Sequence, residues 1–188
     1  MGSDAVDGHL PEPDGSATIG SEPIDSDPDG LACAAARETM VRQMSQVTAA
    51  SAAMHERDDV ARGLGIVIDG AELGAATASM TVTDAMTNGL GTCHGGIIFS
   101  LADTVMGHAS NAGDEKSLAT TASIEWIKAA YTGDRLTATS RAVAARGRNT
   151  VHDVDVLNEA GETIAIFRGQ TLTLGGSVVE DLGTKPND

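Results

Sequence analysis

The stretch TCHGGIIFSLADT, residues 92–104, lies in a segment that carries almost no charge. Between Asp84 and Asp114 the only Asp, Glu, Lys or Arg residue is Asp103, in a chain that holds 27 acidic residues. Apolar residues cover most of the circumference of a helix over residues 95–110, which predicts that this helix is buried. One narrow stripe of the helix carries polar or small residues at helical spacing: Ser100, Asp103, Thr104 and Gly107.

The segments around this helix follow strand patterns. Turn residues separate runs with strand-like alternation, over residues 66–69, 72–82, 118–128, 136–145, 150–157 and 163–174. The runs after the helix are joined by short turns, which predicts an antiparallel meander. One long helix with five or six antiparallel strands gives an α+β fold. A single helix on a curved sheet leaves surface uncovered, so we expect a homo-oligomer.

The two ends of the chain differ from this central part. Residues 1–30 hold no lysine or arginine and four of the five prolines, and they lack an apolar face, so we expect a disordered acidic tail. Residues 31–58 contain neither glycine nor proline and predict an additional N-terminal helix. The globular domain then spans residues 59–176, and residues 177–188 are expected to form a flexible C-terminal tail.

The composition excludes several classes of protein. A net charge of −15 would repel phosphate backbones, so we expect no nucleic-acid partner. Two cysteines, Cys33 and Cys93, provide no disulfide framework, which is typical of a reducing compartment. The sequence has no signal-peptide pattern and no run of 18 apolar residues, so we expect a cytoplasmic protein without a membrane partner.

The start of the central helix suggests catalytic chemistry. Gly95 and Gly96 stand where the first backbone N–H groups of a helix lack internal partners, which is a donor site for an anion or a developing oxyanion. Asp103, in apolar surroundings, could act as a base. Eight residues of helix separate Gly95 from Asp103, about 12 Å at a rise of ~1.5 Å per residue. Both groups would have to lie within about 3 Å of the reacting atoms, so an active site built from them would be shared between two subunits.

Structural explanations exist for the same residues. His94 could simply cap the helix, and Asp103 could be a buried, hydrogen-bonded structural acid. Ser100 lacks the G-x-S-x-G context of a nucleophile elbow. Four residues of this region could in principle bind a metal: Cys93, His94, Asp103 and His108. Their spacing matches no common zinc site, so we expect no metal.

Several motifs resemble the PaaI-like, or phenylacetate-degradation type, hotdog-fold acyl-CoA thioesterases. The resemblance covers about residues 54–176. It is carried by Asn88-Gly89, residues 93–96 (CHGG), residues 99–104 (FSLADT), Asn111, residues 133–139 (GDRLTAT), residues 146–150 (RGRNT) and residues 167–169 (FRG). The resemblance implies a hotdog fold, in which a sheet wraps one central helix, and dimers usually paired into tetramers. It also implies hydrolysis of acyl-CoA thioesters with no cofactor other than the coenzyme A that is part of the substrate.

The resemblance also implies roles for individual residues. Asp103 would be the general base or the nucleophile, and the backbone N–H of Gly95 would polarise the thioester carbonyl. His94 would support this oxyanion site, Asn88 would help to hold water or substrate, and Thr104 would orient the acid. Substrate-binding residues would be Arg148, as a contact for the phosphates of coenzyme A, together with Gly147 and Gly96.

The sequence leaves the acyl group open. The family often has a bulky aromatic residue after the position of Thr104, whereas this chain has Val105-Met106-Gly107. Phenylacetyl, hydroxyphenylacetyl and aliphatic acyl-CoA substrates therefore all remain candidates. Two other functions are alternatives: a hotdog dehydratase or hydratase acting on acyl thioesters, and a non-catalytic acyl-CoA-binding module.

Overall fold

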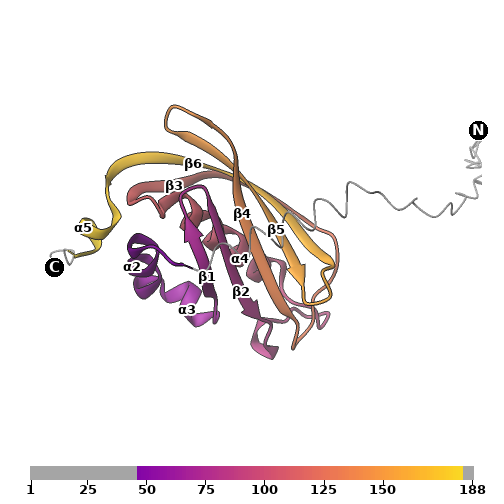
Figure 1. Cartoon of the computed structure of the whole chain (residues 1–188). Helices are drawn as coiled ribbons and strands as arrows, with labels where there is room; N and C mark the ends of the chain where they lie inside the picture. The colour runs from indigo at the N-terminus through magenta and orange to yellow at the C-terminus, as the bar shows by residue number, and fades with distance from the viewer. Residues whose placement is uncertain (1–45, 184–188) are drawn as a thin grey trace, which may run out of the picture.

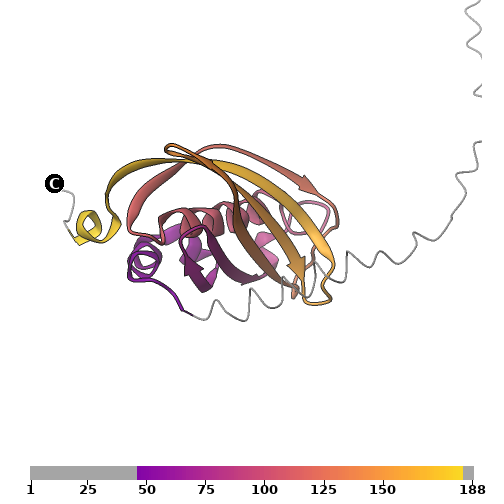
Figure 2. The same ribbon diagram turned by 45° about the horizontal axis from the view of Figure 1, so that its top comes forward.

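A computed structural model describes residues 46–183 as one curved antiparallel sheet around a central helix (Figure 1). The helices are α2 (Ala49–Arg57), α3 (Asp59–Gly63), α4 (Gly95–Asn111) and α5 (Val178–Gly183), with a 3-10 turn η1 (Asp84–Met86). The strands are β1 (Val67–Glu72), β2 (Ala75–Thr81), β3 (Glu115–Trp126), β4 (Arg135–Arg146), β5 (Asn149–Asn158) and β6 (Thr163–Ser177). Figure 2 shows the long strands β3 to β6 arching over α4. The α+β architecture predicted from the sequence is confirmed.

The core lies between α4 and the concave face of the sheet. Apolar residues on α4, including Leu101 and Val105, are fully buried against strand residues such as Leu136 and Phe167. Burial of each such side chain contributes roughly 1.5–3 kcal/mol. Gly169 on β6 lets α4 come close, because a Cβ atom there would lie 2.9 Å from Cε1 of Phe167 and closer still to the sulfur of Met106.

The order of the strands is β1-β2-β4-β5-β6-β3, which partly corrects the predicted meander. β4, β5 and β6 do form a meander, but β3 does not pair with β4 and instead pairs antiparallel with β6 at the far edge. The backbone N–H groups of Ile127 and Lys128 both donate to the carbonyl of Ile164, at 2.9 and 3.2 Å, which holds the end of β3 on β6. The following segment then crosses back to β4, so the turn at residues 131–134 is a crossover and not a hairpin.

Both ends of the described chain differ from the expected boundaries. Within the described part of the helix expected over residues 31–58, the helical residues begin at Ala49, because Val47 is extended and bridges Ala71, and Thr48 caps the helix. Asp58 then ends α2 and caps α3. Residues 1–45, with the expected acidic tail and the first part of that helix, lie outside the described residues.

The C-terminal part is more ordered than expected over residues 177–183. Ser177 belongs to β6, and residues 178–183 form α5 instead of a flexible tail. Asp114 holds this segment in place: its carboxylate accepts hydrogen bonds from the hydroxyl of Ser177 at 2.8 Å and from the N–H of Val179 at 2.9 Å. These bonds lower the pKa of Asp114, together with the N–H of Val178.

One edge of the sheet is left open. β3 is a 12-residue edge strand, and β6 is the only strand beside it among residues 46–183. Most residues of β3 are exposed, including Leu118 and Trp126. A long unpaired strand edge is a template for pairing with another strand. No helix among residues 46–183 is both long enough and apolar enough to cross a membrane.

Candidate active site

The start of α4 offers one uncommitted backbone donor. The ring of His94, the N-cap residue, accepts the N–H of Gly96 through Nδ1 at 3.0 Å. The N–H of Gly95 has no hydrogen-bond partner among residues 46–183. His94 therefore has a capping role in this structure, and the predicted binding residue Gly96 has its N–H already in use. A donor for an anion remains at Gly95.

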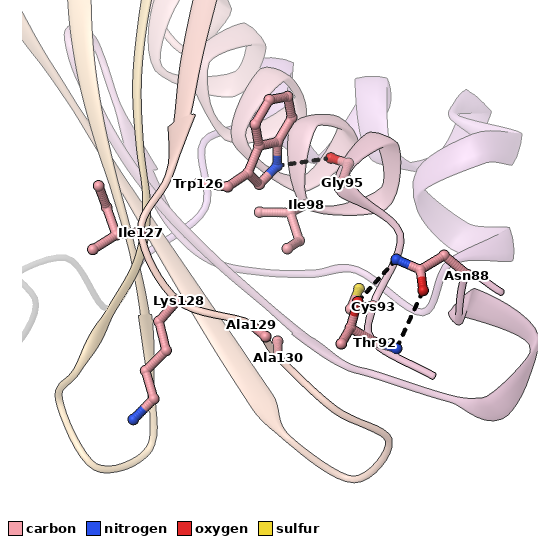
Figure 3. Close-up of a pocket in the computed structure, with 10 residues that line it drawn as sticks. All are labelled: Asn88, Thr92, Cys93, Gly95, Ile98, Trp126, Ile127, Lys128, Ala129 and Ala130. Atoms are coloured by element: carbon pink, nitrogen blue, oxygen red, sulfur yellow. Dashed lines mark hydrogen bonds between the residues drawn. The ribbon is translucent and has the colours of Figure 1, made fainter. Parts of the chain in front are cut away.

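A pocket of about 290 Å³ opens beside this donor (Figure 3). Its lining comes from the loop before α4, the first turns of α4, the end of β3 and the segment after β3: Asn88, Thr92, Cys93, Gly95, Ile98, Trp126, Ile127, Lys128, Ala129 and Ala130. The pocket thus joins two of the predicted residues, Asn88 and Gly95. Its lining combines polar and apolar side chains, and among residues 46–183 Lys128 is the only cation in it.

Asn88 shapes the loop that delivers the donor. Its side-chain oxygen accepts the N–H groups of Leu90 and Thr92, at 2.8 and 3.3 Å, and its amide nitrogen donates to the hydroxyl of Thr92 at 2.8 Å. These bonds close the 88–92 turn, as the dashed lines in Figure 3 indicate in part. One hydrogen of the Asn88 amide is left over for a water or a ligand in the pocket.

Cys93 also lines the pocket, but its thiol is a poor nucleophile. Its side chain is buried, and burial together with the charge of Asp134 raises the pKa of the thiol. A raised pKa leaves the group protonated at neutral pH, whereas thiolate is the reactive form.

Trp126 is a part of this site that the sequence did not indicate. Its indole Nε1–H donates to the carbonyl of Gly95 at 3.3 Å, and its ring lies directly on Gly95. It is the only tryptophan in the chain, and the predicted strand contains it, but no motif marks it as functional. Lys128 was missed for the same reason.

Asp103 lies farther along α4, outside this pocket. Its side chain is half-buried, and its carboxylate forms no hydrogen bond or ion pair within residues 46–183. Burial raises the pKa of Asp103, and the negative charge of Asp58 raises it further. The hydrogen-bonded structural acid that the sequence allowed is therefore not what the described residues show. Thr104 is half-buried beside it, and no hydrogen bond within the described residues links it to the acid.

Gly147 and Arg148 lie at the opposite end of the sheet from the pocket. They form the exposed turn between β4 and β5, where the carbonyl of Arg148 accepts the N–H of Thr173 at 2.8 Å. Thr173 pairs with Ser117 near the start of β3, whereas Trp126 ends β3. Nine residues of strand at ~3.3 Å per residue separate these ends by about 30 Å. Arg148 of one protomer therefore does not reach the pocket of the same protomer.

The second half of α4 is covered by α2. The hydroxyl of Ser51 and Nδ1 of His108 are 2.6 Å apart, and the ring of His55 meets that of His108 edge-on with 6.2 Å between centroids. Burial and the neighbouring His55 lower the pKa of His108 to about 4, so it is neutral at pH 7. His108 is thus remote from Cys93 and His94 at the other end of α4. Residues 46–183 contain no group of three or more potential ligands that could hold a metal ion.

Known proteins share both the sequence and the fold of this chain. Residues 90–165 match the family model of the thioesterase superfamily. The chain is 40% identical over 127 residues to the acyl-coenzyme A thioesterase PaaI of Escherichia coli K12, an alignment that covers 67% of this chain and 90% of that protein.

Two solved structures extend the comparison. The E. coli PaaI protein from the phenylacetic acid degradation operon superposes with a TM-score of 0.67 and 35% identity, covering 70% of this chain and 99% of that one. A Streptococcus mutans protein solved with bound acetyl CoA gives a TM-score of 0.57 and 27% identity, covering 60% and 90%. This chain therefore belongs to the thioesterase superfamily, as a hotdog-fold thioesterase of the PaaI-like type.

Proposed function

We propose that this protein hydrolyses acyl-CoA thioesters to the free acid and coenzyme A, at sites shared between two copies of the chain. The observation that carries the proposal is the uncommitted N–H of Gly95 beside a pocket, with the uncommitted carboxylate of Asp103 farther along the same helix. The name of E. coli PaaI and the acetyl CoA bound to the S. mutans protein support the substrate class.

The separation of the two groups argues for sharing. Eight residues of helix keep Asp103 about 12 Å from Gly95, which is too far for both to act on one carbonyl. The open edge of β3 offers the way to bring in a second copy. Pairing of two β3 edges around a two-fold axis would be antiparallel, and the two α4 helices would then also run in opposite directions. Gly95 of each copy would face Asp103 of the other, which gives two sites per dimer.

The same pairing supplies cations. The start of β3 in one copy would lie beside the end of β3 in the other, so the turn with Arg148 and Gly147 would approach the other copy's pocket. Arg148 is exposed, and Lys128, whose ammonium is paired with Glu162 at 2.5 Å, lines that pocket. Because the chain has a net charge of −15, local cations of this kind would be needed to hold the phosphates of coenzyme A.

The proposed chemistry balances with these groups alone. A water oxygen attacks the thioester carbon while Asp103 takes the water proton. The carbonyl oxygen becomes an oxyanion that accepts the N–H of Gly95, and one such donor is typically worth about 10²–10³ in rate. Collapse breaks the C–S bond, and the proton on Asp103 passes to the departing thiolate. Direct attack by the Asp103 carboxylate, through an anhydride, would use the same two groups.

The proposed substrates include aryl-acetyl thioesters, as the PaaI resemblance suggests, but extend to aliphatic ones. Among the described residues the pocket lining contains one aromatic ring, that of Trp126, together with both aliphatic and polar side chains. For the compartment we propose a reducing cytoplasm, since the described cysteine, Cys93, is a buried free thiol. Pairing of dimers into tetramers is proposed from the family resemblance.

A thiol-release assay tests the reaction. Purified protein is given phenylacetyl, hydroxyphenylacetyl, benzoyl and medium-chain acyl-CoA, and free thiol is followed with time. Asp103→Asn should lose at least about 10²-fold in kcat while keeping its fold and its oligomeric state. Asp69→Asn, which changes an exposed acid on β1, is the matched control and should keep full activity. Full activity in the Asp103 variant would refute the assignment of the acid.

Mixing two inactive variants tests whether the site is shared. Gly95→Pro removes the donor, and the first position of a helix suits the backbone of proline. Its Cβ would lie 3.0 Å from the ring of Trp126, so circular dichroism must first show that the variant folds. A mixed dimer of Asp103→Asn and Gly95→Pro chains has one intact site and one doubly damaged site. Random mixing makes about half of the dimers mixed, so about a quarter of the wild-type activity should return. If each protomer held a complete site, mixing would restore nothing.

A further inference from the structure

The contact between Trp126 and Gly95 has a consequence for the reaction. We propose that Trp126 is a positioning residue, which clamps the first turn of α4 so that the N–H of Gly95 stays aimed at the pocket. This inference rests on the proposed function, since it assigns Trp126 to the donor of the thioesterase reaction.

The contact with Trp126 explains why position 95 is a glycine. Gly95 does not have a positive φ, so its backbone conformation suits any residue. Glycine in a helix costs about 0.5–1 kcal/mol relative to alanine, so its presence here needs another reason. A Cβ atom at position 95 would lie 3.0 Å from both Cε2 and Nε1 of Trp126. The missing side chain is the space that the indole ring occupies.

The start of α4 needs support from side chains, because its backbone is unusually free. Two consecutive glycines, Gly95 and Gly96, have more backbone freedom than any other pair, at the point where the donor must be held still. Two side chains restrict them, one from the residue just before the glycines and one from the end of β3. The ring of His94 binds the N–H of Gly96, and the indole of Trp126 binds the carbonyl of Gly95. The N–H of Gly95 is the polar group of this turn that both contacts leave uncommitted.

Trp126 is itself anchored to the sheet. It is the last residue of β3 and pairs with Ala165 of β6. The next two N–H groups, of Ile127 and Lys128, both bind the carbonyl of Ile164. The indole therefore extends from a strand end that is tied to the sheet, and it transfers that rigidity to the helix start. Trp126 is 55% exposed and lines the pocket, so a ligand bound there would change the surroundings of its ring (Figure 3).

Kinetics of two variants separate positioning from bulk packing. Trp126→Phe keeps an aromatic ring and removes the N–H, and it should lower kcat about tenfold with little change in KM. That loss is smaller than the roughly 10²–10³ expected for losing a donor, because the donor is only loosened. Trp126→Leu should lower kcat at least as much. Val143→Ala, a change of an exposed apolar residue on β4, is the control and should leave kcat unchanged. Unchanged kcat in both folded Trp126 variants would overturn the proposal.

Two further measurements do not depend on turnover. Trp126 is the only tryptophan, so adding coenzyme A to the wild-type protein should change its emission in a saturable way. In addition, Gly95→Ala should destabilise the wild type more than it destabilises Trp126→Leu, because the leucine variant no longer places a ring at that Cβ. Equal destabilisation in both backgrounds would contradict the contact. If no acyl-CoA is hydrolysed by the wild type, the proposed function fails, whereas a flat emission and unchanged variant kinetics in an active enzyme would reject the role of Trp126 alone.

Discussion

The buried histidine between α2 and α4 leads to a prediction about acid stability. His108 is 1% exposed, its Nδ1 lies 2.6 Å from the hydroxyl of Ser51, and its Nε2 has no hydrogen-bond partner in the described part of the chain. Burial and His55 lower the pKa of His108 from 6.5 to about 4, with Asp58 opposing the shift. In the unfolded chain the same ring would take up a proton near its ordinary pKa. Between pH 6.5 and about pH 4, folding therefore has to release a proton from this ring.

The sign and the size follow from this difference. A depressed pKa in the folded state means that the stabilisation is complete above about pH 6.5 and is lost as the pH falls toward about 4. The difference of about 2.5 between the two pKa values of His108 corresponds to roughly 3 kcal/mol of folding free energy, most of it lost by pH 4.5. Other buried groups also titrate, including His152, whose pKa is lowered by burial. A matched variant is needed to remove their contribution.

The assay compares wild type with His108→Gln by urea unfolding at pH 7 and pH 4.5, at one protein concentration. Glutamine can still hydrogen-bond Ser51 but does not titrate. The advantage of the wild type over the variant should shrink by about 2–3 kcal/mol between the two pH values. Parallel losses in both proteins would show that His108 does not carry the acid sensitivity, and would refute the argument from its burial.

Two other predictions concern the neighbours of Asp103 and the packing of α4. Because Asp58 raises the pKa of Asp103, Asp58→Ser should move the acid limb of a plot of log kcat/KM against pH to lower pH. Serine can still cap α3. The control is Asp59→Asn, which changes the exposed neighbouring acid and should leave the acid limb in place. Gly169→Ala should destabilise the fold by roughly 1–3 kcal/mol in denaturant unfolding, because the new methyl group meets Met106 and Phe167. Gly63→Ala, where a Cβ has open space in α3, should be neutral or slightly stabilising, and an equal loss in both variants would argue against the tight packing.

The sequence predicted what depends on local pattern. The apolar periodicity and the single charge of α4 identified the helix from Gly95 to Asn111 and placed Asp103 on it. Period-two alternation identified the strands, because alternation reports which face is buried. The place of β3 at the far edge could not be read in this way, since strand pairing is decided between distant segments. The pairing of Val47 with Ala71, which interrupts the predicted helix over residues 31–58, is likewise a non-local contact that the local pattern does not show.

The candidate site also combines residues that a local pattern indicates with residues whose place depends on non-local contacts. The sequence identified Gly95 and Asp103 from their residue types and spacing, and the helical rise alone was enough to separate them. Trp126 was missed because a tryptophan at a strand end has no local mark of function. The distance of Arg148 from the pocket was also hidden, because it depends on the length and pairing of β3 and β6.

Asp103 allows a last prediction, because its carboxylate is a cost to the isolated fold. It is half-buried, has no hydrogen-bond partner within residues 46–183, and lies within the influence of Asp58. A raised pKa means that folding favours the protonated acid, so the stabilisation is present below the ordinary pKa near 3.8 and is lost as the pH rises through the folded value. At neutral pH the ionised group therefore opposes folding, and Asp103→Asn should raise the Tm while activity is lost. Asp69→Asn should change neither. A lower Tm for the Asp103 variant would mean that the carboxylate has a stabilising partner. A structural role could then explain why an acid stands at this position, and catalysis would not be needed to explain it.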